Sequence, residues 1–130
     1  MYSVLNNNAK SPLFSVEERV KMLKEVTKDI PNVEIDSFSG LTSEYARSKN
    51  VKVLIRGLLA VTDFDYELHL AQTNSLLTDG ELETVFLTTD ISYSFLSAST
   101  VREIASFNGD ISKCVPEYVA NRLYEKYGYK

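Results

Sequence analysis

Three kinds of residue in this sequence suit the binding of phosphate groups. Lys10 and Arg56 supply positive charge, and Ser97 and Ser99 stand at the start of an expected helix, where hydroxyls and backbone N–H groups hold anions. Each has a simpler explanation: a solvated loop lysine, an arginine in a structural ion pair, and serines that only cap the helix. The pattern indicates a small phosphorylated ligand, and both explanations stay open at each residue.

These residues follow segments with the composition of β-strands. Strands are expected at 2–6, 33–38, 51–55 and 83–88. Helices are expected at 15–30, 42–49, 62–77 and 99–107, and from 116 onward. This alternation predicts an α/β domain with a parallel sheet covered by helices on both faces. Ligands of such folds bind beyond the carboxyl ends of the strands, where Lys10, Arg56-Gly57 and Ser94 to Ser99 stand.

Local signals set the ends of the expected elements. Ser15 and Glu18 have the spacing of a capping box, and Thr62 is the expected N-cap of the third helix. Arg56-Gly57 closes the third strand. The buried stripe of the first helix is expected to consist of Val16, Val20, Leu23, Val26 and Ile30. The last helix is expected to bury Val119, Leu123 and Tyr127.

Composition narrows the class of protein. The 130 residues are 44% hydrophobic and 25% charged, which fits one globular domain over residues 1–130. The net charge is −4 and the basic residues are scattered, which argues against nucleic acid, and no apolar run is long enough to span a membrane. One Cys excludes an internal disulfide and favours a cytoplasmic protein, and one His and one Cys are too few for zinc. His69 is expected to be an ordinary surface or packing residue and Cys114 a small buried hydrophobe.

Four segments, in order along the chain, resemble the phosphopantetheine adenylyltransferase family. Lys10 to Arg19 is similar to its Lys-x-Pro-x-Phe segment with the Glu-Glu-Arg that follows. Val33 to Leu41 is similar to the second strand and the pantetheine-side loop. The most specific segment is Val53 to Glu67, which resembles Ile-Arg-Gly-Leu-Arg-Ala-x-x-Asp-Phe-Glu-Tyr-Glu, and Tyr93 to Glu103 resembles a Ser-rich helix start.

The resemblance implies a Rossmann-like nucleotidyltransferase fold and an enzyme of coenzyme A biosynthesis. Such an enzyme transfers AMP from ATP to 4′-phosphopantetheine and gives dephospho-coenzyme A and pyrophosphate. The family also implies Mg²⁺ with ATP, feedback by coenzyme A, a homohexamer and a cytoplasmic location. From the single His and the single Cys, no residue of this chain is expected to be a metal ligand.

The resemblance further implies roles for particular residues. Lys10 and Arg56 are expected to be catalytic, and both are expected to contact phosphopantetheine. The expected ATP-binding residues are Gly57, Glu67, Tyr93, Ser94, Ser97 and Ser99. The remaining phosphopantetheine-binding residues are expected to be Leu41, Thr42, Leu70, Asn74 and Glu103. Four of these residues have simpler alternatives: Gly57 as a strand-to-loop turn, Glu67 as an exposed helix carboxylate, and Leu41 and Leu70 as core residues.

The sequence departs from the family pattern in three places. The N-terminal strand and the helix with a Gly-His element are expected to be missing, because Met1 aligns with the start of the family's second strand. Leu59 stands where the family has a second arginine, and Ala98 replaces the middle one of three serines. A missing strand predicts that the chain folds poorly or needs its neighbours in an oligomer. The alternative function is that of an inactive relative that only binds phosphopantetheine or coenzyme A, or acts as an oligomerising module.

Overall fold

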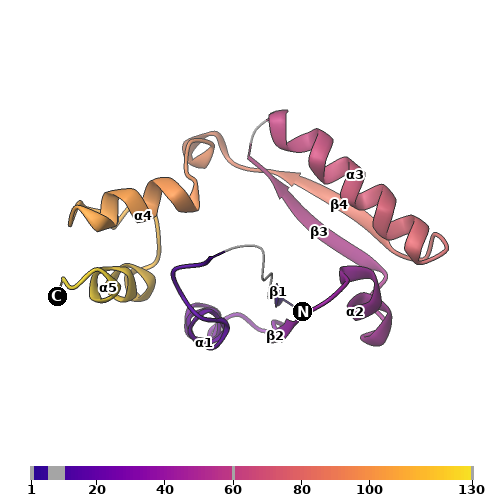
Figure 1. Cartoon of the computed structure of the whole chain (residues 1–130), viewed down its shortest axis with the longest axis horizontal. Helices are drawn as coiled ribbons and strands as arrows, with labels where there is room; N and C mark the ends of the chain where they lie inside the picture. The colour runs from indigo at the N-terminus through magenta and orange to yellow at the C-terminus, as the bar shows by residue number, and fades with distance from the viewer. Residues whose placement is uncertain (1, 6–10, 60, 130) are drawn as a thin grey trace. The chain divides into compact units, whose positions relative to one another are not determined.

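The computed structural model describes residues 2–5, 11–59 and 61–129 (Figure 1). Lys10 and Asn6, both part of the sequence predictions, lie outside the described residues. The contacts of the chain gather in two units. The first unit combines Met1–Ser39 with Leu96–Lys130, and the second is Gly40–Phe95.

The first unit begins with a β-α-β element. Strand β1 (Tyr2–Leu5) pairs in parallel with β2 (Ile35–Phe38), from Tyr2 opposite Ile35 to Leu5 opposite Phe38. Helix α1 (Val16–Val26) connects the two strands and contacts both of them. Parallel strands require such a crossover, because the chain has to return to the same end of the sheet before it can pair again.

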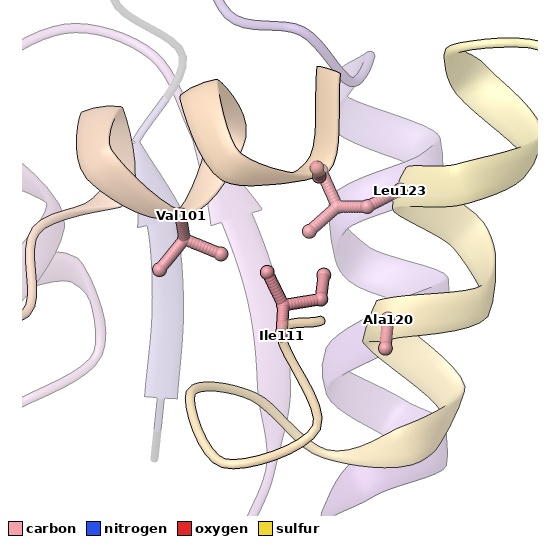
Figure 2. Close-up of a cluster of buried hydrophobic side chains, with 5 residues drawn as sticks. Val101, Ile111, Ala120 and Leu123 are labelled. Carbon is pink, nitrogen blue, oxygen red and sulfur yellow. The ribbon is translucent and has the colours of Figure 1, made fainter. Parts of the chain in front are cut away.

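Two C-terminal helices complete the first unit, α4 (Ala98–Ser106) and α5 (Glu117–Lys126). Figure 2 shows Val101 of α4 and Ala120 and Leu123 of α5 around Ile111, which lies in the loop between these helices. Together with Ala105 these residues form the buried cluster of the unit. The predicted buried face of the last helix is confirmed, since Val119 and Tyr127 pack against the same cluster as Leu123.

The second unit contains the other pair of parallel strands. Helix α2 (Thr42–Ser48) precedes β3 (Val53–Leu58), and α3 (Val61–Leu77) connects β3 to β4 (Glu83–Thr88). The register runs from Val53 opposite Glu83 to Leu58 opposite Thr88. A short 3-10 helix, η1 (Ile91–Tyr93), follows β4.

Helix α3 covers only one face of the β3–β4 sheet. On that face Phe86 meets Phe64 of α3 with its ring edge-on, at a centroid distance of 6.0 Å. The side chains of the opposite face are 46–68% exposed: Val53, Ile55, Val85 and Leu87. Parallel strands are ordinarily apolar on both faces because both are covered. The composition of β3 and β4 follows that rule, but within the second unit only one of the faces is covered.

The predicted α/β class with parallel strands is confirmed. The limits of β4 are those predicted, α2 differs by one residue at its end, and the capping box at Ser15 and Glu18 is present. Among the described residues β1 pairs with β2 in the first unit, and β3 pairs with β4 in the second.

The predicted end of α1 and start of α3 were wrong, and the limits of α4 and the start of α5 differ from the prediction by one residue. Helix α1 ends at Val26 because the Thr27 hydroxyl donates to the Leu23 carbonyl oxygen and a turn follows. Ile30 is therefore outside the helix and 54% exposed, so it is not part of a buried stripe. The buried residue of α1 is Met22, one turn beyond Glu18, on the side that meets α5. Helix α3 begins at Val61, so Thr62 lies within its first turn rather than at the N-cap.

The longest helix of the described chain is α3, with 17 residues, and it carries three acidic side chains, Asp63, Asp65 and Glu67. In the part of the chain that the structure describes, we find no helix whose length and apolar character would let it cross a membrane.

The C-terminal cluster predicts a strong dependence of stability on Ile111, which is fully buried. Replacing Ile111 with Ala should lower the free energy of unfolding by about 2–4 kcal/mol, because the lost side chain leaves a cavity. The same substitution at Ile30, which is 54% exposed, should change it by less than about 0.5 kcal/mol. Urea denaturation followed by circular dichroism measures both, and equal losses would contradict the assignment of the core.

Candidate active site

The centre of the candidate site in the second unit is an ion pair between Arg56 of β3 and Glu67 of α3. The Arg56 Nε donates to Glu67 Oε2 at 2.7 Å and Nη2 donates to Glu67 Oε1 at 2.8 Å. The Glu67 side chain is 11% exposed, whereas that of Arg56 is 49% exposed. Two parallel hydrogen bonds fix the plane of the guanidinium, and its half-exposed position leaves it accessible from solvent.

The electrostatics of this pair favour the charged state of both partners. The hydrogen bonds from Arg56 hold the pKa of the Glu67 carboxyl below its usual range, although partial burial acts in the opposite direction. Glu67 is therefore an anion at neutral pH. The alternative of an exposed helix carboxylate is wrong, because Glu67 is buried against Arg56.

Arg56 was interpreted either as part of a structural ion pair or as a contact for phosphate. The ion pair with Glu67 is present, and it fixes the orientation of the half-exposed guanidinium on the strand. The predicted end of the strand was wrong: Arg56 and Gly57 lie inside β3, opposite Phe86 and Leu87, and the strand continues to Leu58. The charge of Arg56 is thus carried on a regular strand rather than on a loop.

Nothing in the described structure of the second unit requires a glycine at position 57. It lies within β3, so the alternative of a strand-to-loop turn is wrong. Its φ is not positive, and a Cβ added there would meet no described atom within 4 Å. Glycine at this position leaves the backbone open to close approach by a ligand.

The other predicted residues of the second unit lie on α2, α3 and the segment after β4. Leu70 and Asn74 are half-buried and follow Glu67 at spacings of three and seven, which places all three on one face of α3. Leu41 precedes α2 and is 53% exposed, so it is not a core residue, and Thr42 begins that helix. Tyr93 ends η1 and is 53% exposed. Ser94 follows it, and its hydroxyl donates to the Ile91 carbonyl oxygen at 2.9 Å.

The first unit carries the predicted serines at the N-terminus of α4. Ser97 is the N-cap, and its Oγ accepts from the Thr100 backbone N–H at 3.1 Å, so the capping role is confirmed. The same oxygen lies 2.9 Å from the Ser99 Oγ and 2.9 Å from the Thr100 Oγ1. Thr100, which was not among the predicted site residues, therefore belongs to this group of hydroxyls. Its spacing of three from the capping serine is the sequence signal that could have indicated this contact. Glu103 is exposed one turn beyond Ser99.

Among the predicted site residues in the described part of the chain, side-chain hydrogen bonds join Arg56 to Glu67 and Ser97 to Ser99. His69 is exposed, as expected, and Cys114 is partly buried against the C-terminal cluster.

The described residues contain no group of three or more His, Cys, Asp or Glu side chains that could hold a metal ion.

Comparison with known proteins places the chain in a family. The profile of the cytidylyltransferase-like proteins matches residues 1–104. "Phosphopantetheine adenylyltransferase" of Lachnoclostridium phytofermentans is 57% identical over 127 residues, which are 98% of this chain and 77% of that protein. The chain belongs to the phosphopantetheine adenylyltransferase family. The protein of this name from Dictyoglomus thermophilum is 58% identical over the same shares of both chains, and that from Gloeothece citriformis is 57% identical over 93% of this chain and 76% of its own.

Membership of the phosphopantetheine adenylyltransferase family confirms the sequence resemblance and the Rossmann-type fold that it implied. The matched residues include the segments that carry Arg56, Glu67 and the Ser97 cap.

The Arg56–Glu67 pair predicts a pH-dependent contribution to stability. Replacing Glu67 with Gln should lower the free energy of unfolding at pH 7 by about 1–2 kcal/mol, because two charge-assisted hydrogen bonds to a half-exposed arginine are weakened. The folded pKa of Glu67 lies below the unfolded one, so its stabilisation is complete above the unfolded pKa and is lost as the pH falls through the folded pKa. The difference between the two proteins should therefore shrink below about pH 4.

Urea unfolding across this pH range measures the effect. Asp65→Asn, a matched change at an exposed carboxylate of the same helix, should leave stability within about 0.5 kcal/mol of the wild type. A Glu67→Gln effect that is independent of pH would contradict the assignment to the ion pair.

Proposed function

We propose that this chain transfers AMP from ATP to 4′-phosphopantetheine, producing dephospho-coenzyme A and pyrophosphate. The observation that carries the proposal is the guanidinium of Arg56, held by Glu67, in a chain 57% identical to a protein named for this reaction. A binding-only relative is the less favoured reading, because the identity is 53–58% over nearly the whole chain for several proteins of the same name.

The proposed reaction needs charge and alignment rather than a covalent intermediate. A phosphate oxygen of phosphopantetheine attacks the α-phosphorus of ATP, the bond to the bridging oxygen breaks, and pyrophosphate leaves with the bonding electrons. Negative charge builds up on the phosphoryl oxygens during this step, and fixed cations stabilise it. In this proposal Arg56 binds the phosphate of phosphopantetheine, and Lys10 reaches the reacting phosphates.

The remaining residues are proposed to hold the two substrates. On the ATP side, the open backbone at Gly57, the exposed Tyr93 and Ser94, and the hydroxyls of Ser97 and Ser99 support contacts with the nucleotide. Glu67 reaches the same substrate next to the arginine that it orients. The proposed contacts of phosphopantetheine are with one face of α3, the start of α2 and the exposed face of α4: Leu70, Asn74, Leu41, Thr42 and Glu103.

The wider setting follows from the family. We infer that ATP enters with Mg²⁺ on its phosphates, that coenzyme A competes for the phosphopantetheine site, and that the protein is a cytoplasmic homohexamer with no nucleic-acid or membrane partner. Each of these inferences is supported by the resemblance.

The proposal predicts that pyrophosphate release requires both ATP and 4′-phosphopantetheine. Arg56→Ala should lower kcat/KM for phosphopantetheine about 10²-fold, because one fixed cation at the reacting phosphate is removed. Lys52→Ala is the matched control, since Lys52 precedes the same strand, pairs with Glu81 at 2.7 Å and has no proposed contact with substrate. Its activity should stay within about twofold of the wild type. A coupled pyrophosphate assay decides, and equal losses in both variants would count against the role of Arg56.

Leu59 predicts a gain of function. It directly follows β3, three residues beyond Arg56, and is 45% exposed. Leu59→Arg should strengthen ATP binding about tenfold by adding one charge-assisted phosphate contact. Leu76→Arg, which adds the same charge at a 78% exposed position near the end of α3, controls for general attraction of an anion. Isothermal titration calorimetry measures both, and an equal gain in the two variants would show that position 59 has no special part.

A further inference from the structure

The C-terminal helix α5 is tied to the start of α1 by an ion pair between residues 108 positions apart. Lys126 Nζ donates to both carboxylate oxygens of Glu18, at 2.9 Å and 3.0 Å. Arg122, one turn earlier on α5, lies 3.7 Å from the same carboxylate. The side chains of Glu18 and Lys126 are 27% and 36% exposed, so the pair is partly removed from solvent.

Glu18 also fixes the backbone at the N-terminus of α1. Its Oε2 accepts the Ser15 backbone N–H at 2.8 Å, and the Ser15 Oγ accepts the Glu18 backbone N–H at 3.1 Å. The hydrogen bond from Lys126 is the largest cause of a lowered pKa of the Glu18 carboxyl, followed by that from Ser15. Lys126 thus acts on the acceptor that closes the capping box, and α5 contributes to the conformation at which α1 begins.

The segment before Ser15 is held by the same helix pair. Leu13 and Phe14 pack against the buried cluster of Val101, Ala105, Ile111, Ala120 and Leu123. The ammonium of Lys126 lies 5.4 Å from the centre of the Phe14 ring, within the range of a cation–π contact. Lys126 therefore contacts both the segment that leads into α1 and Glu18, whose carboxylate completes the capping box.

We propose that Lys126 and Glu18 are positioning residues that hold the described segment 11–15 on the cluster that also carries the serine cap of α4, Ser97 and Ser99. This inference rests on the proposed function, in which Lys10 reaches the reacting phosphates. Only Ser11 to Phe14 separate Lys10 from Ser15, and Pro12 restricts the backbone of that link.

The serine cap of α4, Ser97 with Ser99, is joined to the same cluster through Val101. Val101, a member of the cluster, lies one turn beyond Ser97 on α4, and its backbone N–H donates to the Ser97 carbonyl oxygen at 3.1 Å. The segment 11–15, which follows Lys10 in the sequence, and the serine cap of α4 are thereby anchored on one small core. Displacing either anchor by a fraction of an ångström changes the alignment on which this type of catalysis depends.

The test uses the full chain and three variants. Lys126→Met removes the charge and keeps most of the side-chain length, Lys126→Arg keeps the charge, and Lys21→Met makes the same change as the first at an exposed lysine of α1. The kcat of Lys126→Met should fall about tenfold with KM for ATP within about twofold, and Lys126→Arg should recover most of the loss. Hydrogen–deuterium exchange should be several-fold faster for the amides of 13–19 in Lys126→Met and unchanged for those of Val101 to Ala105.

The outcomes separate the positioning role from the function on which it rests. A wild-type protein that releases no pyrophosphate would overturn the proposed function and the positioning role with it. An active wild type with unchanged kcat in Lys126→Met would overturn the positioning role alone, even if exchange near Ser15 became faster. An equal loss of kcat in Lys21→Met would also overturn it. The tenfold loss confined to Lys126→Met, with rescue by Lys126→Arg, would support it.

Discussion

Parallel pairing is the constraint from which most of this structure follows. Two parallel strands cannot be joined by a tight turn, so β1 and β2 are connected through α1, and β3 and β4 through α3. The crossover helix has to lie back over the strands that it connects. For α3 this return places Glu67 above β3, within hydrogen-bonding distance of Arg56. The fixed guanidinium is thus a consequence of topology as much as of the two side chains.

Features that depend on neighbours in the sequence were predictable. The capping box of α1 needs only Ser15 and Glu18, three positions apart, and its geometry is local. The limits of β4 follow from a run of β-branched and apolar residues between a turn and a polar segment. The family, and with it the parallel fold, was predictable because four motifs occur in order along one chain.

Features that depend on distant parts of the chain were not predictable. The continuation of β3 through Arg56 and Gly57 is set by pairing with Phe86 and Leu87, which periodicity within β3 does not reveal. The contact of Arg56 with Glu67 depends on how α3 lies over the strand, and that of Lys126 with Glu18 on how α5 meets α1. The early end of α1 had a local cause, but a threonine that bonds back to the preceding turn is a weak signal in the sequence.

The Arg56–Glu67 pair has a consequence for the selection of ligands among the anions of a cell. A lone arginine attracts any small anion, whereas one already neutralised by a carboxylate exerts little long-range field. An incoming anion has to share the guanidinium with Glu67, so charge alone gives it little advantage. At the proposed site a ligand gains affinity mainly through additional points of attachment along its length. Inorganic phosphate and sulfate have none, and a phosphate at the end of a long, partly apolar chain has many.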